Sequence, residues 1–274
     1  MMRELRGKSV FIRQIAHLDT NPVEAARKFA GWGFAWCAPM ITASDGGRTN
    51  RQIEFYRELY RLGVGVIPDW IRPRPGSWRS SIDDFFAFVD QLPLVRAVMF
   101  DPEEHWNDRE GDAQVFAREF GARAKQRGLK VILTTYAMPP PRFPMETFAA
   151  PSDGGVCQTY YITSVYREEI FERSLARWRS RGFADKPLVL GAAFWQKYIP
   201  SPRTKTPEEL ALFLAAMPPT PGLVLWPNQS WGGAVVPLLQ MLSAWEPTAV
   251  PKGAAALLRG LPFGEMIADG IFGG

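Results

Sequence analysis

The regular alternation of strand-like and helix-like segments is the feature that most constrains the fold of this chain. Eight short segments rich in β-branched and aromatic residues follow one another, and most neighbouring pairs are separated by an amphipathic helical pattern. The segments are residues 10–15, 34–41, 64–67, 96–100, 130–136, 156–161, 188–195 and 223–226. Alternation of this kind predicts an α/β protein with a parallel sheet.

The helical patterns carry recognisable start and stop signals. Asn21 and Pro22 open the first pattern, in the order expected for an N-cap followed by the first helical position. Later patterns stop at Gly63, Gly128 and Gly182, as expected for helix C-termini. These signals support helices in the segments that separate the strands.

Eight strand–helix units fit a closed (β/α)8 TIM-type barrel, whose usual length of about 250 residues matches the 274 residues of this chain. An open doubly wound sheet would usually carry a glycine-rich phosphate turn after its first strand, and residues 11–22 contain no glycine. Residues 136–155 are rich in proline and leave room for only a short helix, so the fifth unit is expected to be irregular. We therefore predict a barrel domain at residues 1–248.

An apolar, glycine-rich tail at residues 249–274 follows the barrel. It either folds back under the barrel or docks the protein onto a partner in a larger assembly, and both interpretations stay open. Charged residues interrupt the first 15 positions, and no apolar run reaches the roughly 18 residues of a membrane span. The expectation is cytoplasmic synthesis without a signal peptide and without a membrane span, followed by release or attachment to a particle.

Composition narrows the range of partners and cofactors. The net charge of +4 comes without a run of like charges, which argues against a specific nucleic-acid partner. The two cysteines, Cys37 and Cys157, lie in apolar strand-like segments and are expected to be buried thiols rather than a disulfide. With only two histidines the chain cannot form a His-rich metal centre, so we expect no cofactor and no metal.

In a barrel of this type the active site lies at the carboxyl ends of the strands. The fourth strand-like segment runs directly into Asp101 and Glu103, which alternation along a strand places on the same face. Two carboxylates so close disfavour double ionisation, which raises the pKa of one of them and keeps a proton available. The pattern predicts a general acid at the barrel mouth.

Two other interpretations of these acids remain open. In one, Asp101 and Glu103 are loop carboxylates that pair with arginines such as Arg72, Arg74 or Arg109. In the other, the two acids bind a divalent metal together with His105. Glu104 falls on the opposite face and is expected to be structural.

The other strand ends combine aromatic rings with polar side chains, as a saccharide cleft requires, because sugars have apolar faces and hydroxyl edges. The predicted substrate-binding residues are Asp69, Trp70, Tyr136, Tyr160, Tyr161, Trp195, Trp226 and Asn228.

The Asp-x-Glu of Asp101 and Glu103, within an eightfold β/α alternation, resembles the family 25 lysozymes (muramidases) and, more distantly, the family 18 chitinases. The resemblance implies that Glu103 is the catalytic acid and Asp101 its partner. It also implies that Trp226 floors a sugar subsite, with assistance from Tyr160 or Tyr161. The chain departs from the chitinase pattern at Ala97 and Met99, where that family has earlier aspartates. It departs from family 25, whose first strand usually ends with an aspartate, because residues 13–17 here contain none.

Together these features predict a glycoside hydrolase, of lysozyme-like or phage-like type, that cleaves a polymer of N-acetylated amino sugars, with peptidoglycan as the first choice. Glu103 would protonate the glycosidic oxygen. Asp101 would act as the nucleophile or orient the substrate's acetamido group. The alternative is a non-catalytic barrel that binds glycan or serves a larger assembly through residues 249–274.

Overall fold

A computed structural model describes the greater part of the predicted barrel. The described residues are 5–12, 20–41, 50–92, 94–159, 168–193, 195–196, 203–204, 214, 217–218 and 220–226. The predicted end of the first strand at residues 13–15 lies outside them, as do most of a helical pattern at residues 207–217 and the whole tail at residues 249–274.

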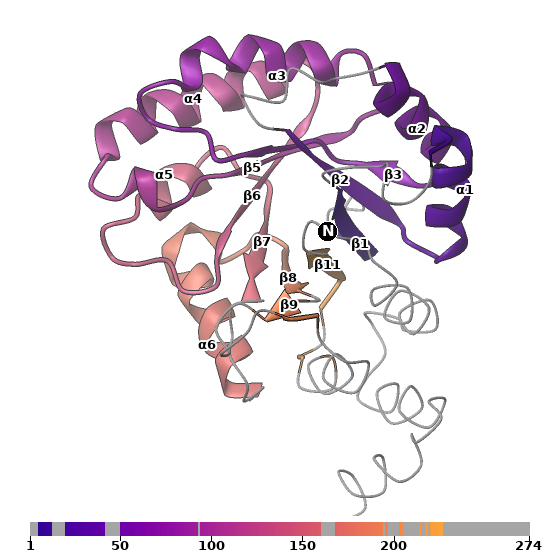
Figure 1. Cartoon of the computed structure of the whole chain (residues 1–274). Helices are drawn as coiled ribbons and strands as arrows, with labels where there is room; N and C mark the ends of the chain where they lie inside the picture. The colour runs from indigo at the N-terminus through magenta and orange to yellow at the C-terminus, as the bar shows by residue number, and fades with distance from the viewer. Residues whose placement is uncertain are drawn as a thin grey trace, which may run out of the picture.

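Parallel strands form a closed ring in the order β1-β11-β8-β7-β6-β5-β4-β2, which the pairing of β1 with β2 completes (Figure 1). The ring strands are β1 (Gly7–Ile12), β2 (Trp36–Ile41), β3 (Gly65–Val66), β4 (Asp69–Ile71), β5 (Ala97–Asp101), β6 (Lys130–Tyr136), β7 (Gly154–Gln158), β8 (Leu188–Ala193) and β11 (Gly222–Trp226). β3 and β4 both pair with β2 and form one interrupted strand. The structure is thus the predicted (β/α)8 barrel, with a small antiparallel sheet of β9 (Trp195–Gln196) and β10 (Arg203–Thr204) after β8.

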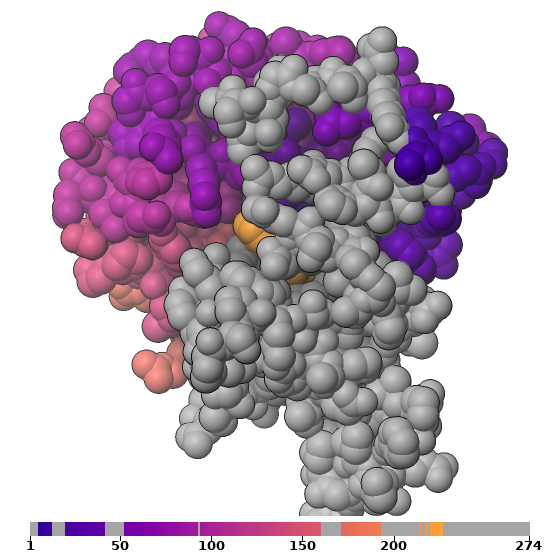
Figure 2. Space-filling model, in the orientation of Figure 1, coloured from indigo at the N-terminus to yellow at the C-terminus, as the bar shows by residue number. Residues whose placement is uncertain are grey.

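Helices cover the outside of the ring in chain order (Figure 1). They are α1 (Pro22–Gly31), α2 (Asn50–Arg61), α3 (Ile82–Val89), α4 (Glu110–Gln126), α5 (Met145–Ala149) and α6 (Glu168–Trp178). In the space-filling view the indigo N-terminal segments lie on one side of the described surface and the later magenta and salmon segments on the other (Figure 2). None of the helices in the described ranges is long and apolar enough to cross a bilayer.

The predicted helix boundaries are confirmed by their caps. The Asn21 side chain accepts hydrogen bonds from the backbone N–H groups of Val23 (2.9 Å) and Glu24 (3.3 Å). Gly63 and Gly128 end α2 and α4 with φ angles of +81° and +67°, a conformation that side chains with a Cβ rarely adopt. The irregular fifth unit is also confirmed, because α5 has only five residues.

Two elements differ from the sequence-based expectation. α3 was not singled out from the sequence, although it is amphipathic: five of its side chains are buried, while Asp83, Asp84 and Ala87 form an exposed face. The third strand, expected to end at residue 67, resumes after Pro68 as β4. Asp69 and Trp70 therefore lie on a strand of the ring and not in the loop after it.

Two separate apolar clusters hold the barrel together. The inner cluster lies inside the ring and takes its side chains from most of the strands and from Leu5 and Ile67 beside them: Leu5, Phe11, Trp36, Ala38, Ile67, Ala97, Met99, Ile132, Val156, Val189 and Val224. The outer cluster lies between the strands and the helices and is rich in aromatic rings, among them Trp70, Phe100, Phe116 and Phe120. Each fully buried large side chain of this kind contributes about 1.5–3 kcal/mol to folding.

The two cysteines behave as expected. Cys37 and Cys157 are free and buried, and burial raises the pKa of both thiols.

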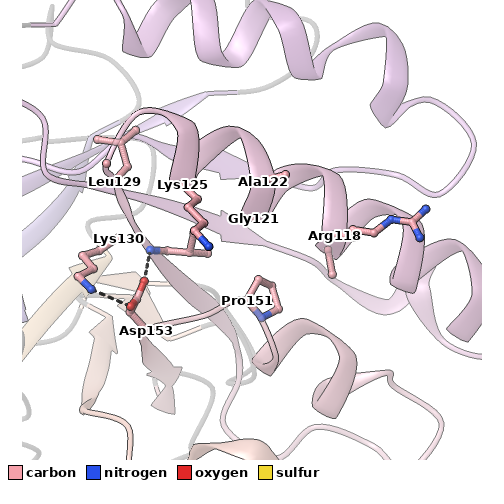
Figure 3. A pocket seen from close by; sticks show the side chains of 11 residues that line it. Arg118, Gly121, Ala122, Lys125, Leu129, Lys130, Pro151 and Asp153 are labelled. Atoms are coloured by element: carbon pink, nitrogen blue, oxygen red, sulfur yellow. Dashed lines mark hydrogen bonds and ion pairs between the residues drawn. The ribbon is translucent and has the colours of Figure 1, made fainter.

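A cavity of about 530 Å³ lies where α4 meets the start of β6 and the segment before β7 (Figure 3). Lys130 at its edge forms an ion pair with Asp153 (3.0 Å), whose other carboxylate oxygen accepts a hydrogen bond from the backbone N–H of Val131 (2.9 Å). Because this cavity adjoins the amino-terminal ends of the strands, it is at the opposite end of the barrel from Asp101.

Candidate active site

β5 carries Asp101 into the interior of the ring. Ala97 and Met99 belong to the inner cluster and Phe100 to the outer one, so the predicted alternation is confirmed and Asp101 points inward. Asp101 is 2% exposed. Glu103 follows in extended backbone after Pro102, and its side chain is 13% exposed. Of the two acids, Glu103 is therefore the more accessible to solvent.

Two contacts fix the chain around these acids. The Thr135 hydroxyl on β6 donates to the Pro102 carbonyl oxygen (2.8 Å), which holds the turn between Asp101 and Glu103. The indole N–H of buried Trp106 donates to the Pro73 carbonyl oxygen (2.5 Å) and joins the segment after β5 to the segment after β4. The acids thus sit on a braced strand end.

Asp69 brings a third carboxyl to this end of the ring. It is in register with Met99 on the neighbouring strand β5, so its side chain points into the interior as that of Met99 does. Asp69 is 0% exposed, and neither of its carboxyl oxygens has a hydrogen-bond partner among the described residues. One carboxyl oxygen of Asp101, Oδ1, also lacks a hydrogen-bond partner among the described residues.

Two further polar side chains, Thr134 on β6 and Gln158 on β7, lie on the strands that follow β5 in the ring. Both are buried, and the Gln158 amide donates to the Thr134 hydroxyl (3.1 Å). Neither residue was singled out from the sequence. The signal was available: each lies two positions after an inward apolar residue of its strand, Ile132 and Val156 respectively.

The electrostatics of the inner carboxyls follow from burial. Burial is the largest cause that raises the pKa of Asp69, and the charge of Glu103 adds to it. Burial likewise raises the pKa of Asp101, followed by the charges of Asp69 and Glu103, while a hydrogen bond with Gln158 and the charge of Arg72 act in the opposite direction. The pair of Asp69 and Asp101 therefore keeps a proton at pH values above those at which an exposed aspartate loses it.

Glu103 forms an ion pair with Arg72, whose Nε lies 2.8 Å from Glu103 Oε2. This is the arginine pairing that was left open from the sequence, and it is realised at Glu103 through Arg72. Burial still raises the pKa of Glu103, with Arg72 opposing the rise. Arg72 has a φ of +53°, and its backbone N–H donates to the Asp101 carbonyl oxygen (3.0 Å), which ties the arginine to the strand end. Its side chain is 59% exposed.

Glu104 has a structural contact, as expected. Its carboxylate accepts a hydrogen bond from the Tyr136 hydroxyl (2.6 Å), which lowers the pKa of Glu104. The hydroxyl of Tyr136 is thereby engaged next to Glu103. Within the described ranges no three His, Cys, Asp or Glu side chains are grouped so as to hold a metal ion, so their geometry does not favour the alternative in which Asp101, Glu103 and His105 bind one.

The aromatic residues expected at the mouth are distributed differently. Trp226 ends β11, half-buried, packs against the inner cluster and lies 5.8 Å from Phe11 between ring centroids. Trp70 points the other way: it is 2% exposed in the outer cluster and stacks on Phe85 at 5.5 Å, so it does not face the mouth. Trp195 begins β9, but its side chain is not described. Tyr160, Tyr161 and Asn228 lie outside the described residues.

Comparison with known proteins places the fold but not a family. The chain matches no protein-family model and no curated protein sequence. Among solved structures it is similar to a chitinase from Chromobacterium violaceum, with a TM-score of 0.61 at 12% identity over 88% of this chain and 100% of that one. It is also similar to the spore cortex-lytic enzyme SleL of Bacillus megaterium (TM-score 0.57, 10% identity, 92% of this chain and 73% of that one).

Barrels of other chemistry are similar as well. The tryptophan synthase of M. tuberculosis has a TM-score of 0.53 at 10% identity, over 93% of this chain and 94% of that one. Likeness at this level of identity shows the (β/α)8 fold, and the chemistry has to be argued from the side chains of the site.

Proposed function

We propose that this protein is a glycoside hydrolase that acts on a polymer of N-acetylated amino sugars, with peptidoglycan as the first candidate. The observation that carries the proposal is Glu103: a partly exposed acid at the carboxyl end of a barrel strand, with a raised pKa and the buried Asp101 two positions before it. The similarity in fold to a chitinase and a cortex-lytic enzyme supports this class of substrate. Family 25 muramidases remain a finer alternative within it.

The geometry assigns different roles to the two acids. Glu103 would donate its proton to the glycosidic oxygen as the bond to the leaving sugar breaks and the substrate's own acetamido oxygen bonds to the anomeric carbon. It would then take a proton from the water that attacks this carbon and releases the acetamido oxygen. Asp101 is almost fully buried and its pKa is raised, so a neutral Asp101 that orients the substrate's acetamido group fits better than an ionised nucleophile. No step of this scheme uses a cofactor.

The same end of the barrel has an aromatic ring and polar side chains that could bind a sugar chain. The half-buried ring of Trp226 lies inside the same end of the barrel and can support the apolar face of a sugar. Thr134 and Gln158 supply polar groups deeper in the ring. Arg72 must release Glu103 before that acid can donate a proton, and its exposed side chain has room to do so.

A second candidate function is a non-catalytic barrel that binds glycan or joins an assembly through residues 249–274. The ion pair between Arg72 and Glu103 favours it, because a guanidinium held against the acid stabilises the carboxylate form. Synthesis in the cytoplasm followed by release or attachment to a particle is part of either proposal.

The deciding experiment compares the release of reducing ends from purified peptidoglycan and from chitooligosaccharides. We expect Glu103→Gln to lower the rate by about 10²- to 10⁴-fold, the usual contribution of a general acid. Glu119→Gln is the matched control, because Glu119 lies on α4 outside the ring and contacts Arg123. It should hydrolyse at the wild-type rate.

Two outcomes would overturn the hydrolase proposal. One is equal release by wild type and Glu103→Gln, which would assign any hydrolysis to other residues. The other is no release by wild type from either polymer; sedimentation of the protein with insoluble peptidoglycan would then identify it as the non-catalytic barrel. Cooperative unfolding of each variant shows that a loss of rate is not a loss of fold.

A further inference from the structure

The inner carboxyls of Asp69 and Asp101 have oxygens without partners in a place where such oxygens are costly. Asp69 is fully buried with both oxygens unpartnered among the described residues, and Asp101 has one. A buried polar atom without a hydrogen bond costs about 1–3 kcal/mol. A local arrangement that satisfies several of these oxygens at once is therefore strongly favoured.

The two residues occupy neighbouring strand positions. They lie on adjacent parallel strands, β4 and β5, with Asp69 in register with Met99 and Asp101 in register with Ile71, so their positions are diagonal to each other on the inner face. Their charges act on each other: the charge of Asp69 is the second cause, after burial, that raises the pKa of Asp101. Two ionised carboxylates are acceptors only, so neither can satisfy the other without a proton.

Among the described residues, the charged and polar groups that face the pair do not neutralise two negative charges. Glu103, on the segment after β5, adds a third acid. Arg72, after β4, is engaged with Glu103 and has a small effect on Asp101. Thr134 on β6 and Gln158 on β7 are neutral, and of these Gln158 hydrogen-bonds Asp101. The described groups around the pair can therefore stabilise one negative charge but not two.

We propose that Asp69 and Asp101 share a single proton at neutral pH and form one O–H···O⁻ unit, in which Asp69 is a positioning residue that sets the protonation state of Asp101. A hydrogen bond between a carboxylic acid and a carboxylate is short and strong, and it satisfies oxygens of both residues. Met99, which is in register with Asp69, has no group that could share a proton with Asp101. Asp69 provides that group from the neighbouring strand.

This inference deepens the proposed function and rests on it in one respect: in a hydrolase, the shared proton would keep Asp101 neutral toward the acetamido group. The proton-sharing unit itself requires no substrate. Its test can succeed or fail whether or not the protein cleaves a glycan.

The experiment follows the carboxyl carbons of the full chain, labelled with ¹³C at aspartate, by NMR as the pH is raised, without substrate. The signals of Asp69 and Asp101 are assigned by their disappearance in Asp69→Asn and Asp101→Asn. In wild type we expect the two residues to titrate together in two steps, one below and one above neutral pH. In Asp69→Asn, Asp101 should keep a single step at lower pH than the upper wild-type step, and Asp101→Asn should change Asp69 in the same way.

Asp112→Asn is the control, because Asp112 lies on α4, outside the ring; it should leave both steps in place. The proposal is overturned if wild type shows both carboxyls ionised, or both protonated, across neutral pH. It is also overturned if either residue titrates unchanged when the other is replaced. If either Asn variant folds poorly, Asp69→Ser or Asp101→Ser provides the same assignment and the same comparison. A shared proton in a protein that cleaves no glycan would sink the proposed function and leave this inference intact.

Discussion

Asp69 and Trp70 are consecutive residues of β4, and both are almost completely buried, but they face opposite environments. Trp70 turns outward and contacts the rings of Phe85, Phe116 and Phe120, so its burial stabilises the fold. Asp69 turns inward, where no described group satisfies its oxygens, so its burial costs free energy. On β4, the outward side chain therefore contributes to stability, whereas the inward carboxyl lowers it.

The largest effect is expected from damage to the outer side. Phe116 is fully buried and contacts the rings of Trp70, Trp78, Phe100 and Trp106. Phe116→Ala should lower the free energy of unfolding by about 3–5 kcal/mol, through lost transfer energy and the cavity left behind. Urea unfolding measures this. A loss below about 1 kcal/mol would contradict the assignment of stability to the outer cluster.

A smaller and pH-dependent effect is expected on the inner side. The pKa of Asp69 is raised in the folded state, so its contribution to stability is complete below the unfolded value of about 3.9 and is lost as the pH rises toward the folded value. Asp69→Asn removes this dependence. Between pH 4 and pH 8 the variant should gain about 1–3 kcal/mol relative to wild type.

Urea unfolding across that pH range measures the difference, with Asp112→Asn expected to parallel wild type. If Asp69→Asn also parallels wild type, Asp69 does not increase proton binding by the folded chain in this pH range, and the contrast between the two sides of β4 loses its electrostatic part.

The smallest effect is expected at the rim, where Arg72 meets Glu103. Since Arg72 lowers the pKa of Glu103, Arg72→Gln should raise it further. An ion pair with so exposed an arginine contributes about 0.2–1 kcal/mol, so the rise should stay below about one pH unit and the stability should change little. A ¹³C titration of Glu103 measures the shift; a fall in the pKa would show that Arg72 does not hold this carboxylate.

Much of the fold could be predicted from local pattern. The strand segments, the Asn21 cap, the glycine stops at Gly63 and Gly128, and the short helix of the fifth unit all depend on neighbours in sequence. The amphipathic pattern of α3 was present in the sequence but was not singled out, whereas β4 was missed because Pro68 interrupts the third strand.

The site was predictable only in part. Alternation along one strand was enough to predict that the side chain of Asp101 points inward, and this prediction is confirmed. It could not decide that Asp69 lies beside Asp101 while Trp70 lies behind the sheet, since that depends on where the third strand resumes and on its register with β5. The choice of Arg72 over Arg74 or Arg109 as the partner of Glu103 is likewise a matter of loop position.

The amino-acid sequence by itself determined the architecture, because strand and helix periods, caps and breaks act over a few residues. Only the tertiary structure decided that Asp69 and Asp101 are buried on the same inner face and that Glu103 forms an ion pair with Arg72. Pairing between strands and the burial it imposes arise from contacts far apart in the chain, and the protonation of a carboxyl follows from those contacts.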